Sequence, residues 1–98
     1  METLTKKQIL LIQLMEECDE VSQRCAKALR FGLDEVQEGQ IMTNEERIRL
    51  EFNDLLAVAD ILNENGVDVG RVSNWVSVKR KKIEHYLQHS AKEGILVD

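Results

Sequence analysis

The stretch TKKQILLIQLMEECDEVSQRCAKALRFG, residues 5–32, decides the fold class of this 98-residue chain. It opens with Thr5 and Gln8 at the spacing of a helix capping box, and it closes with a glycine, the residue that most often ends a helix. No proline interrupts it, because the sequence contains none. These features predict one helix that reaches about Phe31 and ends at Gly32 in a left-handed conformation.

The same signals recur along the chain and predict two more helices. Thr43 and Glu46 repeat the capping-box spacing, and Asp68 is expected to cap the helix that follows Gly66. The expected ranges of these two helices are residues 43–64 and 68–91. The segment between the first two helices, residues 33–42, is expected to be a loop with room for one short helical turn.

Together these elements predict an all-α fold. We expect an antiparallel helical bundle of three long helices, with room for a fourth short one, in a single domain over residues 1–98. A chain of this length builds only a thin core. The first helix is apolar on more than one side near its start, which predicts neighbours on both flanks. We therefore expect a homo-oligomer, a dimer or tetramer, with a four-helix-bundle-like core.

Composition narrows the class of protein. Lys plus Arg total 13 and Asp plus Glu total 18, so the net charge is −5, which argues against a nucleic-acid-binding protein. No uncharged apolar run approaches the ~18 residues of a membrane span, and the sequence does not begin like a signal peptide. We therefore expect a cytoplasmic protein without membrane contact. Two cysteines, Cys18 and Cys25, are interpreted as small buried apolar residues.

Acidic residues of the first helix gather on one side of it. The heptad-like spacing predicts a buried seam on another side, made of Leu11, Met15, Cys18, Ser22, Cys25 and Leu29. Glu16, Glu17 and Glu20 lie outside this seam, where three acids usually form a solvated face. Ile9 and Ile12 share their sector, however, so we expect another element to cover it.

The second helix brings two more carboxylates. Its apolar face is predicted from Ile48, Leu50, Leu55, Ala57, Val58, Ile61 and Leu62. Glu51 and Asp54 fall near the middle of that face. Burying an unpaired carboxylate costs several kcal/mol, so these acids need Lys or Arg partners, protonation or a divalent cation. With up to five carboxylates, we favour a hard cation such as Mg²⁺.

Basic residues lie one or two helical turns from these acids. Lys27 follows Glu20 by seven residues on the same helical stripe, and Lys79 flanks the apolar stripe of the third helix. Arg80 and Lys81 are interpreted as solvated residues. Acids that hold a cation beside lysines predict a polyphosphate ligand.

The spacing of the acids resembles a known signature. Glu16-Glu17-Cys18-Asp19-Glu20, followed by Glu51-Phe52-Asn53-Asp54, is similar to the EExxE…ExxD motif of the MazG-like all-α nucleoside triphosphate pyrophosphohydrolases. The segment 27–32 also resembles the short phage and bacterial members. The similarity covers roughly residues 9–87.

The resemblance implies Mg²⁺-dependent hydrolysis of a nucleoside triphosphate (NTP or dNTP) to the monophosphate and pyrophosphate, with Mn²⁺ as an alternative cation. It assigns the metal to four carboxylates: Glu17, Glu20, Glu51 and Asp54. It places Glu16 beside these ligands, on a second cation or orienting water, as a further catalytic acid. Lys27 and Lys79 would stabilise charge on the phosphates.

Two alternatives stay open at this point. The chain could be a non-enzymatic helical interaction module, in which the same acids are surface charge or pair with a basic partner. It could also keep the fold and act on a different nucleotide, such as dUTP or phosphoribosyl-ATP. The sequence does not indicate which base or sugar is preferred.

Overall fold

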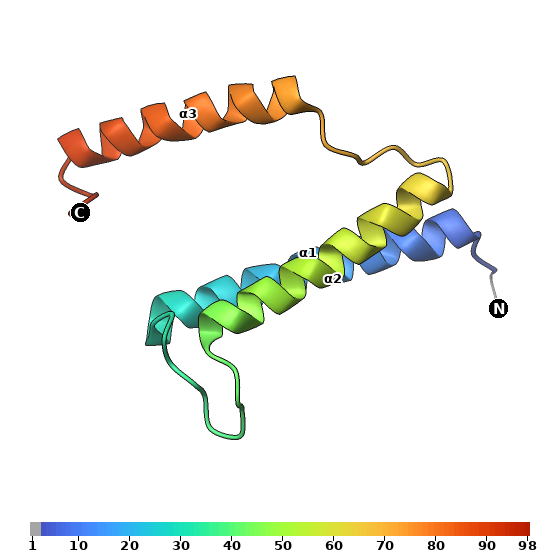
Figure 1. Cartoon of the computed structure of the whole chain (residues 1–98), viewed down its shortest axis with the longest axis horizontal. Helices are drawn as coiled ribbons and strands as arrows, with labels where there is room; N and C mark the ends of the chain where they lie inside the picture. Colours follow the sequence, from blue (N-terminus) through green and yellow to red (C-terminus); the bar gives the residue numbers. More distant parts are fainter. Residues whose placement is uncertain (1–2) are drawn as a thin grey trace.

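The computed structural model describes residues 3–98, so residues 1 and 2 of the predicted domain lie outside the described part. The described residues form three helices and no strand, which confirms the all-α class. The helices are α1 (Lys6–Phe31), α2 (Asn44–Glu64) and α3 (Ser73–Lys92). α1 and α2 pack side by side as an antiparallel hairpin, and α3 lies apart from them (Figure 1).

Both predicted capping boxes are present. The Thr5 hydroxyl accepts from the Gln8 amide at 3.1 Å, and the Gln8 side chain accepts from the Thr5 amide at 2.9 Å. Thr43 and Glu46 make the same reciprocal pair at 3.1 and 3.0 Å. At the end of α1, Gly32 has φ 97° and ψ 150°. The positive φ was expected, but this ψ lies outside the left-handed helical region and is open to glycine almost alone.

The loop between α1 and α2 contains no helical turn, and Asn44 holds it closed. The Asn44 side chain donates to the Gly32 carbonyl at 2.8 Å and to the Glu35 carboxylate at 3.2 Å. Its backbone amide donates to the Glu35 carbonyl at 2.9 Å. Asn44 is 1% exposed, so these bonds form in a nearly dry environment. They replace the backbone bonds that a short helix would have made.

The third helix starts later than predicted, at Ser73. Asp68 caps no helix: its carboxylate accepts from the Gly70 amide at 3.2 Å and so closes a local turn. The Val69 amide donates to the Asn63 side chain at 2.8 Å, which ties the linker to the end of α2. The residue before α3, Val72, is extended and offers no side-chain cap.

The residues of α1 that pack against α2 follow a heptad spacing. Each of them precedes a residue of the predicted seam by one position. The least exposed residues of α1 are Leu10, Leu14, Glu17, Glu20, Val21, Arg24 and Ala28. Those of α2 are Asn44, Arg47, Ile48, Glu51, Leu55, Val58, Ala59 and Leu62. The apolar core lies at the end where α1 begins, with Leu14 and Val67 packed against Leu10, Val58 and Leu62.

The predicted α1 seam is therefore wrong. Met15 is 68% exposed and Leu29 is 90% exposed. Cys18 and Cys25 are also exposed, which corrects their interpretation as buried residues. Two competing stripes run along α1, and periodicity alone favours the one that contains no charged residue. The stripe that packs on α2 includes two carboxylates and an arginine.

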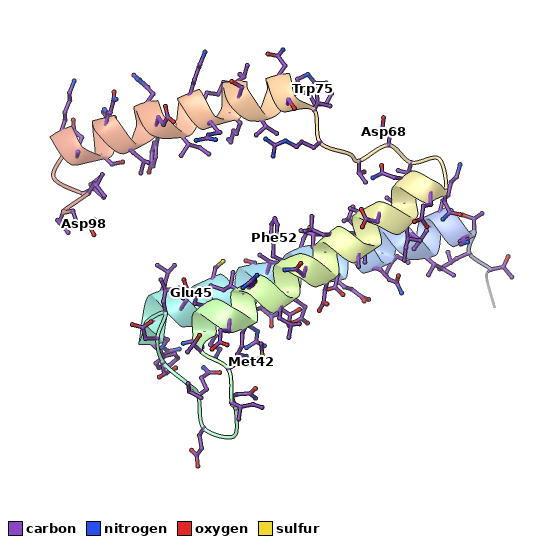
Figure 2. All side chains as sticks on the ribbon, viewed as in Figure 1. Met42, Glu45, Phe52, Asp68, Trp75 and Asp98 are labelled. Carbon is purple, nitrogen blue, oxygen red and sulfur yellow. The ribbon has the colours of Figure 1, made fainter. Side chains whose placement is uncertain are left out.

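α3 makes no packing contact with α1 or α2. Side chains project all round it, with Trp75 near its start (Figure 2). Its far end is closed by the tail, because the Ile95 and Leu96 amides donate to the Ser90 carbonyl at 2.9 and 3.1 Å. Among residues 3–98 no helix combines the length and the apolar character needed to cross a membrane.

Replacing Asn44 tests the loop closure. Asn44→Ala removes the side-chain donor of both bonds and leaves a gap at a position that is 1% exposed, so we expect a loss of about 1–3 kcal/mol in the free energy of unfolding. Chemical denaturation followed by circular dichroism measures it. The control is Asn53→Ala, whose exposed side chain bonds only within its own helix, and which should change stability by less than about 0.5 kcal/mol. Equal effects of the two variants would contradict this role of Asn44.

Candidate metal centre

Three carboxylates from two helices meet in the middle of the hairpin. Glu17 of α1 and Glu51 and Asp54 of α2 each offer an oxygen, and these oxygens lie within 4.8 Å of one another. Glu17 and Glu51 are half-buried and Asp54 is exposed. The group is thus open to solvent on the Asp54 side and enclosed by the helices on the other.

The heptad register explains why these side chains face each other. Glu17 lies seven residues after Leu10 in the α1 seam, and Glu51 lies seven before Val58 in the α2 seam. Both occupy positions that an ordinary antiparallel pair fills with apolar side chains. Asp54 is three residues after Glu51, on the adjoining edge of the same face. The sequence predicts both Glu51 and Asp54 near the middle of the apolar face of α2. In the structure, only Glu51 lies in the middle of the face that packs on α1, and Asp54 is exposed at its edge.

The surroundings of Glu17 raise the pKa of its carboxyl group above the ordinary value. The largest cause is desolvation, followed by the charges of Asp54 and Glu51 and then of Glu20 and Glu16. All of these causes act in the same direction, and none is a nearby cation. Within the described residues, desolvation and neighbouring like charges thus both disfavour the ionised form of Glu17.

The remaining predicted acids lie beside this cluster. Glu20 is half-buried one turn further along α1, and Glu16 is exposed next to Glu17. Both are near enough for their charges to raise the Glu17 pKa. Neither belongs to the group of three whose oxygens lie within 4.8 Å of one another. The structure therefore gathers three of the four expected ligands and places the fourth nearby.

The two predicted lysines are not at the cluster within one chain. Lys27 is exposed, and its ammonium lies 6.0 Å from the centre of the Phe31 ring, which indicates a weak cation–π contact. Ten residues separate it from Glu17, about 15 Å of helix rise. Lys79 lies on α3, which does not contact the hairpin.

Arg24 is a basic residue near the acids to which the resemblance assigns no role. It lies two turns after Glu17 in the α1 seam and is half-buried, and its Nε atom is shielded from solvent with no hydrogen-bond partner. An arginine with an unused, desolvated donor is well suited to an anionic ligand. The sequence signal for this position is the alternating four- and three-residue spacing of residues 10, 14, 17, 21, 24 and 28. That spacing places Arg24 on the same face of α1 as Glu17.

A hollow of about 530 Å³ runs along α2, apart from the cluster, and is lined by Glu45, Glu46, Ile48, Arg49, Phe52 and Asn53. We assign the site from the carboxylates instead, because a cation needs converging oxygen atoms more than an enclosed volume.

We compared the chain with known proteins. Family models, curated proteins and solved structures all give no match to it. Functional inference therefore depends on the site itself.

Removing one charge from the cluster tests its electrostatics. Because the folded state raises the pKa of Glu17, ionisation of this group destabilises the fold as pH rises from the ordinary value through the raised one. Without divalent cations at neutral pH, Glu17→Gln should therefore melt at a higher temperature than the wild type. The difference should vanish below the ordinary pKa, where Glu17 is protonated in both states.

Melting curves over a pH series, recorded by circular dichroism, measure this difference. Asp19→Asn is the control, since Asp19 is exposed on the opposite side of α1. Its melting temperature should follow the wild type across the series. A Glu17→Gln variant that melts below the wild type at neutral pH would contradict the repulsion.

Proposed function

We propose that this protein hydrolyses a nucleoside triphosphate to the monophosphate and pyrophosphate with Mg²⁺. The observation that carries the proposal is the meeting of Glu17, Glu51 and Asp54 between α1 and α2 without a counter-charge. These residues belong to the two motifs whose spacing resembles that of the MazG-like pyrophosphohydrolases. An all-α hairpin that joins both motifs agrees with that resemblance.

The donor set fits a hard divalent cation. Carboxylate oxygens are the ligands that Mg²⁺ and Mn²⁺ take in proteins, usually with several waters retained. Glu17, Glu51 and Asp54 would hold the cation, with Glu20 as the fourth ligand. The open Asp54 side leaves room for water and for phosphate oxygens. Histidine and cysteine, which softer metals prefer, are absent from the group.

The bound cation would supply Lewis-acid polarisation of the phosphate oxygens and of the attacking water. Glu16, exposed beside the ligands, would orient that water and accept its proton. As the phosphoanhydride bond breaks, negative charge grows on the leaving pyrophosphate. Arg24, with its unused Nε–H, would donate to the phosphates, and Lys27 and Lys79 would stabilise their charge.

The proposal includes the setting of the enzyme. We place it in the cytoplasm as a homo-oligomer, a dimer or tetramer, that binds a nucleotide and neither nucleic acid nor membrane. The net charge of −5 disfavours a polyanionic duplex as ligand. A single nucleotide differs, because a bound cation offsets its charge locally.

A non-enzymatic interaction module is the second candidate. It is favoured by the many exposed apolar side chains, which include Phe52, Trp75 and Tyr86. In that case the acids would pair with a basic partner, and no cation would be needed. The same fold with dUTP or phosphoribosyl-ATP as substrate is a variant of the first candidate.

A panel of nucleotides tests the proposed activity. With Mg²⁺ present, we expect at least one NTP or dNTP to yield equimolar monophosphate and pyrophosphate, identified by chromatography and a pyrophosphate assay. Asp54→Asn should lower turnover by at least roughly tenfold. Replacing a residue that only hydrogen-bonds to a metal ligand already lowers metal affinity or activity by about 10–100-fold, and Asp54 is proposed as a ligand itself. Asp60→Asn, an exposed acid of the same helix, should keep wild-type turnover. Silence across the panel, dUTP and phosphoribosyl-ATP included, would reject the enzyme.

Thermal denaturation separates the two candidates without a substrate. A cation that binds the folded state raises its stability by about 2.7 kcal/mol at a hundred times its dissociation constant. Mg²⁺ should therefore raise the melting temperature of the wild type and of Asp60→Asn, and should have little effect on Asp54→Asn. An interaction module would show no rise beyond that caused by NaCl at equal ionic strength.

A further inference from the structure

α3 is an amphipathic helix that makes no packing contact with the hairpin. One face of it collects apolar side chains at spacings of one or two helical turns: Val72, Val76, Ile83 and Leu87. Lys79 and Arg80 flank the middle of this face, one on each edge. A helix with such a face normally buries it against another element.

The side of the hairpin on which the acid cluster opens carries a matching pattern. Leu50, Asp54 and Ile61 lie along one edge of α2 on this side. Leu50 is 47% exposed and Ile61 is 40% exposed, with the exposed Asp54 between them. On the same side, α1 presents Glu16 and Glu20 beside the cluster. We call these five residues the acidic side of the hairpin; its acids lie in the middle and its apolar residues lie toward the ends.

The spacings on the two surfaces agree. Along one edge of the α3 face, three residues lie seven and then four positions apart: Val72, Lys79 and Ile83. Along the edge of α2, followed in the opposite direction, the same intervals separate another three: Ile61, Asp54 and Leu50. α3 already runs in the direction opposite to α2 (Figure 1). An antiparallel packing in this register therefore sets the lysine level with the aspartate, and each apolar residue level with an apolar one.

The second edge of the α3 face matches α1 in charge. When Lys79 lies over α2, Arg80 is rotated by about 100° and lies over α1, where Glu16 and Glu20 are presented. The helix as a whole is basic, with five lysines and arginines and one acid, whereas the net charge of the chain is −5. Apolar contacts and both cations thus favour the same register, and a slip of one position would turn the face away.

The linker allows α3 to reach this surface of its own hairpin. It is tied to the hairpin up to Val69, because Val67 packs on the core and the Val69 amide donates to the Asn63 side chain at 2.8 Å. Residues 70–72 follow, are exposed, and begin with Gly70, a residue whose backbone rotates at little steric cost. Three extended residues span about 10 Å, and packed helices lie about 8–10 Å apart. Rotation at residues 70–72 is therefore enough to lay α3 on the hairpin.

We propose that α3 is a lid that closes over the acidic side of its own hairpin. In the cation-free protein, Lys79 then pairs with Asp54, and Arg80 pairs with Glu16 or Glu20. A cation bound at the cluster would take over the carboxylates and leave both basic side chains free to bind phosphate oxygens. Only this last step rests on the proposed function. The closure itself depends on the register, the charges and the reach of the linker.

Disulfide trapping tests the closed register without any turnover. In full-length chains whose Cys18 and Cys25 are replaced by serine, Leu50→Cys is combined with Ile83→Cys. Oxidised glutathione joins the two thiols as a disulfide and is itself reduced to two glutathione molecules, which take up the two protons. We expect this disulfide in most chains, because the closed register sets the two residues face to face.

The matched control combines Phe52→Cys with Ile83→Cys in the same background. Phe52 is 48% exposed, like Leu50 at 47%, but it lies on the opposite side of α2. Its disulfide should form at least roughly tenfold more slowly, because thiols on surfaces that face apart do not reach the geometry that the bond requires. Circular dichroism shows that both variants are folded.

A second measurement uses the wild type, so that the test does not depend on engineered cysteines. A carbodiimide joins a lysine Nζ to a nearby carboxylate as an amide, and the oxygen lost from the carboxylate leaves in the urea by-product. Without divalent cations, peptide mass spectrometry should find Lys79 joined to Asp54. Lys79→Ala should lose this link, whereas Lys81→Ala, on the opposite side of α3, should keep it.

Isotopic labels show which chain supplies α3. Light and heavy chains are mixed, unfolded and refolded together before each reaction, and both links should then join residues of one label only. Links between labels would show that α3 packs on another copy, and would overturn the proposal. A disulfide no faster than the control, or a wild type without the link from Lys79 to Asp54, would also overturn it. A silent nucleotide panel would leave positive links intact, so failure of the proposed function is distinguishable from failure of the lid.

Discussion

The antiparallel contact of α1 and α2 is the constraint on which the other features depend, and its centre is unusual. A heptad seam stabilises a helix pair by removing apolar side chains from water. In this hairpin the seam is apolar at one end, around Leu62, and is closed by hydrogen bonds of Asn44 at the other. Between these ends, Glu17 and Glu51 replace the expected apolar side chains. The ends of the hairpin therefore hold its centre in an electrostatically unfavourable arrangement.

In that arrangement the same residues would bear on both stability and the proposed function. Carboxylates held together by packing cannot relax away from one another, so their repulsion persists until a cation or proton arrives. A cation bound as proposed would therefore stabilise the hairpin. Arg24, two turns away with a desolvated donor, places a positive group in the same seam. Cation and phosphate ligands would thus meet along one line between the helices.

A thin core has a second consequence, which concerns assembly. Few apolar residues of the hairpin are fully buried, and α3 adds none to them. The homo-oligomer that we propose would cover part of the apolar side chains that the chain leaves exposed.

The sequence by itself determined the helices and the identity of the acids. Both capping boxes and the ends at Phe31 and Glu64 follow from local spacing, which short-range bonds and helix periodicity control. Only the tertiary structure decided which of two stripes on α1 faces α2, because packing against a partner outweighs the apolar content of a single stripe. It also decided that Asp68 shapes a linker and that α3 stands apart, since the bonds of Asn63 and Val67 depend on where α2 ends.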